Sequence, residues 1–175
     1  YNGNGQLGNG NTINQLKPTA IEGFDSPIAG ISASDNHTVA LTVHDTLYAW
    51  GYNSSGQLGN GNQINQSSPT KITGFDSPII DMTTGSEHTA VLTETGTLYS
   101  WGNNECGQLG NEATDDTLSP TKVSKFSAES ESYTIAQRGL SNAFRLFHSH
   151  RRQENNSLKE TESTAASQTI NLHSK

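Results

Sequence analysis

The sequence predicts an all-β fold, an incomplete β-propeller of two to three four-stranded antiparallel blades followed by a C-terminal tail that does not repeat. Two observations predict it. The hexapeptide "GQLGNG" at 5–10 returns at 56–61, and once more as "GQLGNE" at 107–112. Each period also contains several short β-favouring runs separated by Gly, Asn, Pro and Ser. Short strands, four to a unit in tandem, are typical of propeller blades.

The period is 51 residues and holds over the first 126 residues. Residues 1–51 align with 52–102 without a gap, and about 30 of the 51 positions are identical. Such self-similarity at a fixed step marks a repeat architecture. We therefore divide residues 1–126 into two complete repeats and a partial third (1–51, 52–102 and 103–126), and treat 127–175 as a divergent tail.

Four strands are expected in each repeat. In chain order the candidate runs are "PTAIEG" (18–23) or "PTKITG" (69–74), "SPIAGIS" (26–32) or "SPIIDMT" (77–83), "HTVALT" (37–42) or "HTAVLT" (88–93), and "TLYAWG" (46–51) or "TLYSWG" (97–102). The last two runs are separated by three or four residues, which suits a hairpin. The turn contains Gly96 in the second repeat and His44-Asp45 in the first, a costlier but tolerated choice.

The motifs resemble the repeat of the regulator of chromosome condensation family. They are His-Thr, the Leu-Tyr-x-Trp-Gly strand end, Gly-Gln-Leu-Gly and the Pro-Thr strand, and they cover residues 1 to about 126 in that order. The rival kelch repeat calls for a Gly-Gly doublet, which is absent here. The resemblance implies seven blades, or about 357 residues at this period. The chain has 175 residues, so we expect it to be a fragment or a truncated form.

The repeated glycines could hold a phosphate or build turns. A phosphate cradle needs converging backbone N–H groups at a helix start and usually a Lys. The segment "GQLGNGNQINQ" predicts no helix and contains no Lys. We therefore interpret the glycines as tight turns between blades, with Leu7, Leu58 and Leu109 buried.

No catalytic, metal or cofactor site is expected. His37 and His88 each lie alone at the head of a strand, so we expect hydrogen-bonded histidines packed inside their blades. The two His of "HSHRR" (148–152) are spaced i, i+2 and would lie on opposite sides of a helix. No nucleophile, base and orienting group stand together, and no cofactor is implied.

The tail has a different pattern. Leu140, Ala143, Phe144 and Phe147 fall at helical spacing, which predicts a short amphipathic helix near 140–151. This helix could cover the last blade, dock elsewhere or be an unfolded remnant. From about Gln153 onward, Ser, Thr, Glu and Asn dominate, and low hydrophobicity favours disorder.

Charge and composition restrict the partners. Residues 1–126 carry 12 Asp and Glu against 4 Lys and Arg, a net charge of −8. Nucleic-acid binding requires a basic surface, so we expect no nucleic-acid partner. No apolar run is long enough to cross a membrane. The single cysteine, Cys106, excludes an internal disulfide framework. The compartment is left open, with the cytoplasm favoured.

Two function classes remain. We favour a non-catalytic protein-interaction scaffold. The alternative is guanine-nucleotide exchange on a small GTPase, which the resemblance implies and which would need blades that these repeats do not supply. Partner contacts should use polar loop positions that vary between repeats, because shared residues build the blade. These candidates are Asn4, Asp35, Ser54, Ser55, Glu87 and Glu105.

Overall fold

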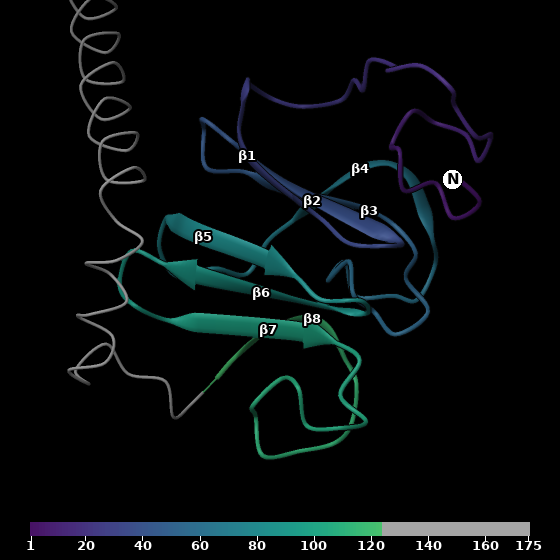
Figure 1. The fold of residues 1–175 in the computed structure, drawn as a ribbon. Helices are drawn as coiled ribbons and strands as arrows, with labels where there is room; N and C mark the ends of the chain where they lie inside the picture. The colour runs from purple at the N-terminus through teal and green to yellow at the C-terminus, as the bar shows by residue number, and fades with distance from the viewer. Residues whose placement is uncertain (124–175) are drawn as a thin grey trace, which may run out of the picture. The chain divides into compact units, whose positions relative to one another are not determined.

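The computed structural model describes residues 1–123, which form two four-stranded antiparallel sheets and no helix (Figure 1). Blade 1 consists of β1 (Ile28–Ala33), β2 (His37–Thr42), β3 (Leu47–Gly51) and β4 (Gln66–Ile72). Blade 2 consists of β5 (Ile79–Thr84), β6 (His88–Thr93), β7 (Leu98–Gly102) and β8 (Thr117–Lys122). In each sheet the strands neighbour one another in chain order. The predicted fold class is confirmed.

The two blades are copies in register as well as in sequence. In the β2–β3 hairpin His37 pairs with Gly51, and in the β6–β7 hairpin His88 pairs with Gly102. The hairpin turns need a residue with positive φ. Gly96 supplies it in blade 2 with φ 82°, whereas Asp45 adopts φ 63° in blade 1, a conformation that Asp tolerates better than most residues.

One predicted strand is wrong. Residues 18–23 form no strand, whereas the equivalent run in the next repeat belongs to β4. β4 exists because it pairs with β3, the "LYAWG" strand of its own blade. Residues 18–23 pair with no strand among residues 1–123. Each blade therefore takes its strands from two successive 51-residue units, over 28–72 and 79–122.

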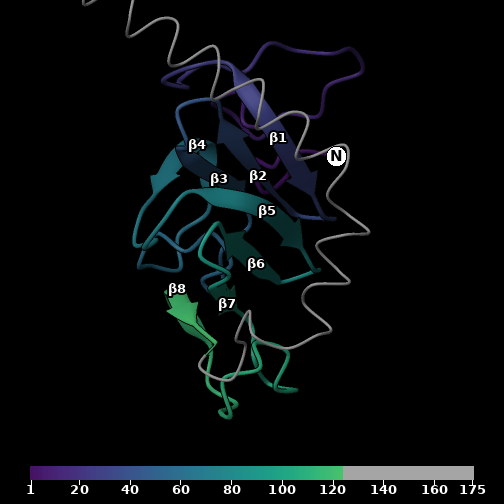
Figure 2. The ribbon, with the colours of Figure 1, turned by 90° about the vertical axis from the view of Figure 1, so that its left-hand side faces the viewer.

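The main core lies between the blades. β5 lies beside β1 and β2 (Figure 2), and one face of blade 1 packs on blade 2 in a cluster that includes Val39, Leu41, Val91, Tyr99 and Trp101. The other face of blade 1 carries Ala40, Tyr48 and Trp50, against which Ile21 and Phe24 pack. The segment before β1 thus covers blade 1, although it adds no strand.

Two of the predictions concern residues beyond 123. The helix predicted at 140–151 and the disorder predicted beyond it fall outside the described residues. Within residues 1–123, the structure contains no helix with the length and apolar character needed to cross a membrane.

Candidate protein-interaction site

The Gly-Gln-Leu-Gly segments connect one blade to the next. The segment 52–65 joins β3 to β4, yet the carbonyl oxygen of Gln57 accepts hydrogen bonds from blade 2, from Trp101 Nε1 at 2.9 Å and Thr89 Oγ1 at 2.8 Å. The carbonyl oxygen of Gln6 accepts the equivalent bonds from Trp50 Nε1 and Thr38 Oγ1 at 2.9 and 3.1 Å. The hexapeptide, which we call the clasp, therefore accepts the hydrogen bond of a buried indole N–H group.

The glycines in this clasp serve backbone geometry. Gly59 has φ +78°, and a Cβ built on it would lie 2.5 Å from Trp101 Nε1. Any side chain there would be strained in its backbone and would also displace the indole. Leu58 and Leu109 are buried as predicted, and Leu7 is half-buried. These observations support turns rather than a phosphate cradle.

A buried asparagine organises each of these loops and was not singled out from the sequence. Asn53 is fully buried; its Nδ2 donates to the carbonyl oxygens of Asn62 and Ile64 at 2.9 and 3.1 Å, and its Oδ1 accepts from Leu58 N at 2.9 Å. Asn2 and Asn104 make the same set of contacts. The available signal was their recurrence every 51 residues.

The predicted contact residues gather at one end of the two sheets, where β1 and β3 end and β2 begins. We call this the loop end, and define it as residues 1–16, 34–36, 52–65, 85–87 and 103–116. Asp35, Ser54 and Glu105 are exposed there, and Asn4 and Glu87 are half-buried. Ser55 is 8% exposed, and its backbone N–H donates to Gln57 Oε1. Its side chain is withdrawn from the surface.

Segments far apart in the sequence meet at this end. Asn4 Nδ2 donates to Asn36 Oδ1 at 3.2 Å, and Asn4 Oδ1 accepts from Asn65 Nδ2 at 3.4 Å. Gln6 Nε2 also donates to the carbonyl oxygen of Asp35 at 3.3 Å. The three loops therefore hold one another in place and form a pre-organised polar surface.

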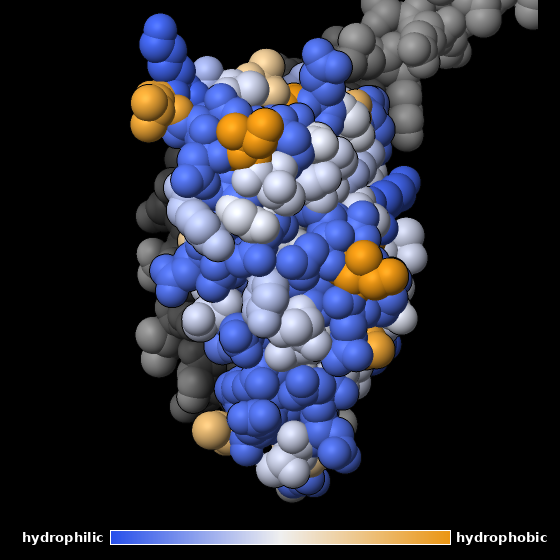
Figure 3. Space-filling view, turned by 90° about the vertical axis from the view of Figure 1, so that its right-hand side faces the viewer, coloured by the Kyte–Doolittle hydropathy of each residue, from blue (hydrophilic) through white to orange (hydrophobic). Residues whose placement is uncertain are grey.

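The loop end is acidic. It carries no Lys or Arg, and its six carboxylates are Asp35, Glu87, Glu105, Glu112, Asp115 and Asp116. Lys17, Lys71 and Lys122, the three Lys of the described residues, all lie outside it. Figure 3 faces this end and shows a mostly hydrophilic surface on which hydrophobic side chains stand apart from one another. The surface suits a polar, positively charged partner rather than an apolar one.

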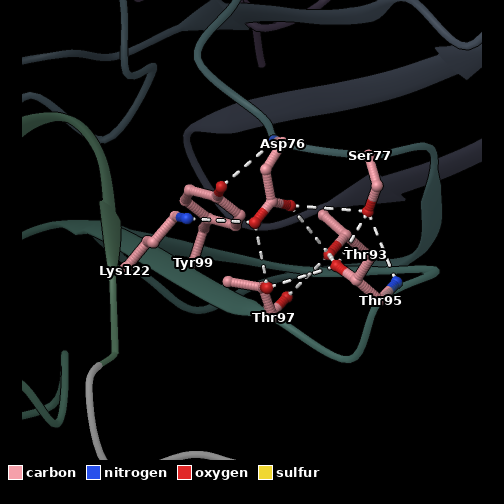
Figure 4. Close-up of polar contacts among 7 residues, drawn as sticks. All are labelled: Asp76, Ser77, Thr93, Thr95, Thr97, Tyr99 and Lys122. Carbon is pink, nitrogen blue, oxygen red and sulfur yellow. Dashed lines mark hydrogen bonds and ion pairs between the residues drawn. The ribbon is translucent and has the colours of Figure 1, made fainter.

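The opposite end of blade 2 is tied by a second polar network (Figure 4). Asp76 Oδ2 accepts from Lys122 Nζ at 3.0 Å and from Thr97 Oγ1 at 3.1 Å, and the Tyr99 hydroxyl accepts from Asp76 N at 3.1 Å. The bond from Lys122, with those from the nearby hydroxyls, lowers the pKa of Asp76 to about 2. This network joins the segment before β5 to the hairpin and to β8.

An equivalent network is present in blade 1, and neither of the two was predicted from the sequence. Asp25 Oδ2 accepts from Thr46 Oγ1 at 2.5 Å, and this hydrogen bond lowers the pKa of the Asp25 carboxyl. The missed signal is the run Phe-Asp-Ser-Pro, at 24–27 and again at 75–78. Both acids serve architecture, since each closes its blade at the end away from the loop end.

The two repeated histidines differ in their surroundings. His37 is fully buried; Nδ1 lies 2.9 Å from Ser34 Oγ and Nε2 lies 3.0 Å from Thr89 Oγ1 of the next blade. We expected a histidine packed inside its own blade, and instead it bridges two. His88 is half-exposed, and its ring makes no hydrogen bond within the described residues. Over residues 1–123 no three His, Cys, Asp or Glu residues are grouped as metal ligands would be.

Comparison with known proteins agrees with the blade geometry. The sequence profile of the Regulator of chromosome condensation (RCC1) repeat matches residues 1–41, 44–92 and 95–136. The chain belongs to the RCC1 repeat family. The third match of the RCC1 repeat ends ten residues beyond Phe126, where we placed the end of the repeat pattern.

Relatives of this RCC1-repeat chain are longer proteins. It is 33% identical over 125 residues to the human probable E3 ubiquitin-protein ligase HERC3, covering 70% of this chain and 12% of HERC3. It is 35% identical to the ultraviolet-B receptor UVR8 of Arabidopsis thaliana, covering 73% of this chain and 30% of UVR8. The crystal structure of Prp20p from Saccharomyces cerevisiae superposes with a TM-score of 0.63 at 24% identity, covering 70% of this chain and 32% of Prp20p.

Proposed function

We propose that this RCC1-repeat chain is a non-catalytic scaffold that binds a basic protein partner through its loop end. The observation that carries the proposal is the charge of that end, with six carboxylates and no Lys or Arg. Carboxylates arranged on one surface steer a positively charged partner toward it and make the association rate salt-sensitive. Asp35 and Glu105 are exposed and lie on loops, where a rigid scaffold usually carries recognition.

The rigidity of the loop end supports the same proposal. Asn4 bonds to both Asn36 and Asn65, so three separate segments are joined. A surface that is already ordered loses little conformational freedom when a partner binds. The polar positions that vary between repeats are therefore carried by loops held in one conformation, as a recognition surface requires.

The relatives support a scaffold rather than a chemistry shared by the repeats. Two relatives contain sequence similar to these repeats, yet their names denote different activities, a probable ubiquitin ligase and an ultraviolet-B receptor. The study of Prp20p describes binding to Gsp1p and histones. We infer that the repeats of this chain bind a protein, and that any covalent chemistry would belong to other domains of a larger protein.

The test uses purified core histones as a basic probe and duplex DNA as an acidic probe. Two double variants reverse the same number of charges, Asp35→Lys with Glu105→Lys at the loop end and Glu22→Lys with Glu94→Lys at the opposite end. We expect saturable histone binding that the loop-end variant weakens at least tenfold and the control variant changes less than twofold, with no binding to DNA. An equal loss of histone binding in both variants, or preferred binding to DNA, would contradict the proposal.

Guanine-nucleotide exchange on a small GTPase is the second candidate, which the Gsp1p binding described for Prp20p brings into view. The two complete repeats align without any insertion that could act as a wedge at a nucleotide site. An exchange activity would therefore need blades other than these. We expect this chain to leave the release of a fluorescent guanine nucleotide from a small GTPase unchanged, and accelerated release would favour the exchange function instead.

A further inference from the structure

One position of the loop end presents a side chain outward in three successive repeats. Ile13, Ile64 and Asp115 occupy it at the 51-residue step, and all three are exposed. In each repeat the backbone carbonyl oxygen of this residue accepts a hydrogen bond from the buried asparagine of the loop, at 3.1, 3.1 and 3.2 Å. The backbone is therefore held in the same way while the side chain differs. We call 13, 64 and 115 the presenting positions.

The two isoleucines at the presenting positions are exposed although they repeat. Ile13 and Ile64 are both 67% exposed, and neither belongs to a core cluster of the described residues. Every other exposed large hydrophobic residue of 1–123 has a repeat counterpart that is polar or at least half-buried. These pairs are Tyr1 and Tyr52, Leu16 and Ser67, Ile28 and Ile79, and Ile31 and Met82. A residue that repeats without packing in the blades needs a reason other than architecture.

Ile64 is exposed although the loops on both sides of it are described. Asn65 Nδ2 donates to Asn4 Oδ1 of the preceding loop at 3.4 Å. Gly61 N donates to the carbonyl oxygen of Leu118, just after the following loop, at 2.9 Å. The exposure of Ile64 therefore does not come from the lack of a neighbouring loop.

The carboxylates of the loop end are unevenly divided among its three long loops. Residues 1–16 and 52–65 contain no Asp or Glu, whereas 103–116 contains Glu105, Glu112, Asp115 and Asp116. The presenting position changes from isoleucine to a carboxylate in the same loop. The loop end thus has a neutral side, which presents Ile64, and an acidic side, which presents Asp115.

We propose that the loop end binds a bipartite segment of its protein partner, in which apolar side chains stand beside a cluster of Lys or Arg. The apolar side chains pack on Ile64, and the basic cluster meets residues 103–116. This inference rests on the proposed function, and it adds which side chains of the partner are recognised and in which direction the segment lies. Charge complementarity favours such a segment over a nucleic acid or an anionic membrane, because the acidic side repels phosphate groups.

A single isoleucine can anchor a partner when its backbone is fixed. Ile64 N donates to Asn62 Oδ1 at 2.8 Å, so both backbone groups of this residue are bonded within its loop. Its β-branched side chain has few rotamers, and little conformational freedom is lost on binding. Covering the exposed part of such a side chain should strengthen binding about tenfold.

The first test compares two synthetic peptides by fluorescence anisotropy on the full 175-residue chain. One peptide has two leucines beside four lysines, and the other has glutamines in place of the leucines, so length and charge are equal. We expect the leucine peptide to bind about tenfold more tightly. This preference should persist as salt is raised, because salt screens charges and not apolar contacts. Equal affinities would overturn this inference and leave the proposed function in place, whereas binding of neither peptide would overturn both.

Two variants of matched exposure locate the apolar contact. Ile64→Gln removes the isoleucine of the neutral side, and Ile31→Gln removes one that is 64% exposed on β1, outside the loop end. We expect Ile64→Gln to abolish the preference for the leucine peptide and Ile31→Gln to leave it unchanged. Thermal unfolding checks that both variants are folded. A preference that survives Ile64→Gln, or that both variants lose equally, would show that the apolar contact is not at Ile64.

The acidic side is tested by Glu105→Gln combined with Asp115→Asn, which neutralises two carboxylates at nearly constant shape. This double variant should weaken both peptides by the same factor, so the preference for the leucine peptide remains. If the affinity of both peptides were unchanged, the basic cluster would not lie on residues 103–116.

The direction of the bound segment is tested with a spin label on the leucine peptide. A label at the leucine end should broaden the amide NMR signals of residues 52–65 most strongly, and a label at the lysine end those of residues 103–116. The same broadening pattern from both labels would overturn the bipartite arrangement.

Discussion

His37 Nε2 lies 3.0 Å from Thr89 Oγ1, and the two residues belong to different blades. The Thr89 hydroxyl also bonds to the carbonyl oxygen of Gln57 at 2.8 Å, and a carbonyl oxygen can only accept. The single hydrogen of Thr89 is therefore used on Gln57, so His37 must carry its proton on Nε2 and accept from Ser34 Oγ through Nδ1. A series of hydrogen bonds through Ser34, His37, Thr89 and Gln57 therefore links both blades to the clasp.

Thr89→Val should be more damaging than the same change at its repeat counterpart. It removes the acceptor for His37 and the donor for Gln57, and leaves a buried ring nitrogen unpaired, at a cost of about 2–3 kcal/mol. Thr38→Val removes one bond to Gln6 and should cost about 1 kcal/mol. Urea unfolding followed by circular dichroism measures both, and equal losses would mean that the link to His37 adds no stability.

Stability should fall when the solution is made mildly acidic. Burial lowers the pKa of His37 from 6.5 to about 4, with the nearby His88 adding to the effect. Between these values the unfolded chain binds more protons than the folded one, so the free energy of unfolding rises with pH. The contribution of His37 is complete above about pH 6.5 and is lost as the pH falls toward 4, on the order of 3 kcal/mol at most.

The measurement is the free energy of unfolding at intervals from pH 7 to 4. His37→Gln should flatten the curve over this window, and His44→Gln, at an exposed turn, controls for the loss of one histidine. Asp76 loses its contribution only between pH 3.8 and about 2, so its effect is separate. A curve for His37→Gln as steep as that of the unchanged chain would contradict the assignment.

The fold was predictable because packing residues repeat at a fixed step, so Trp50 and Trp101 or Leu58 and Leu109 could be assigned together. The absence of a strand at 18–23 could not be predicted, because a strand needs a pairing partner and the run "PTAIEG" carries the same local signal with or without one. The role of Thr89 depended on a contact between residues 52 positions apart. Ser55 looked like a variable loop residue, but its burial follows from the turn that Gln57 closes.

Trp50→Ala should destabilise the chain by about 3–5 kcal/mol, because it removes a fully buried ring and leaves a cavity. The ring packs against Phe24 with centroids 5.9 Å apart, and its Nε1 donates to the Gln6 carbonyl oxygen at 2.9 Å. Trp50→Phe keeps most of the apolar volume and loses the N–H donor, so it should cost less, about 1–2 kcal/mol. A loss below about 1 kcal/mol for Trp50→Ala would show that the clasp does not hold in solution.

Gly59→Ala should disrupt the clasp far more than Gly61→Ala, although both glycines have nearly the same backbone conformation. Their φ angles are +78° and +81°, so an alanine at either site meets a left-handed strain of about 1–2 kcal/mol. The surroundings differ, because a Cβ at Gly59 would lie 2.5 Å from Trp101 Nε1, whereas the nearest atom to a Cβ at Gly61 is Ser119 Oγ at 3.8 Å.

The difference between the two alanine variants therefore measures the steric term alone. We expect Gly61→Ala to lose about 1–2 kcal/mol and Gly59→Ala to lose at least twice as much in urea unfolding. Calorimetric titration of the unchanged chain with ATP, GTP and phosphate should show no binding, because the glycines hold an indole and not an anion. Saturable nucleotide binding that Gly59→Ala abolishes while Gly61→Ala preserves it would reverse the interpretation of this loop as a structural turn.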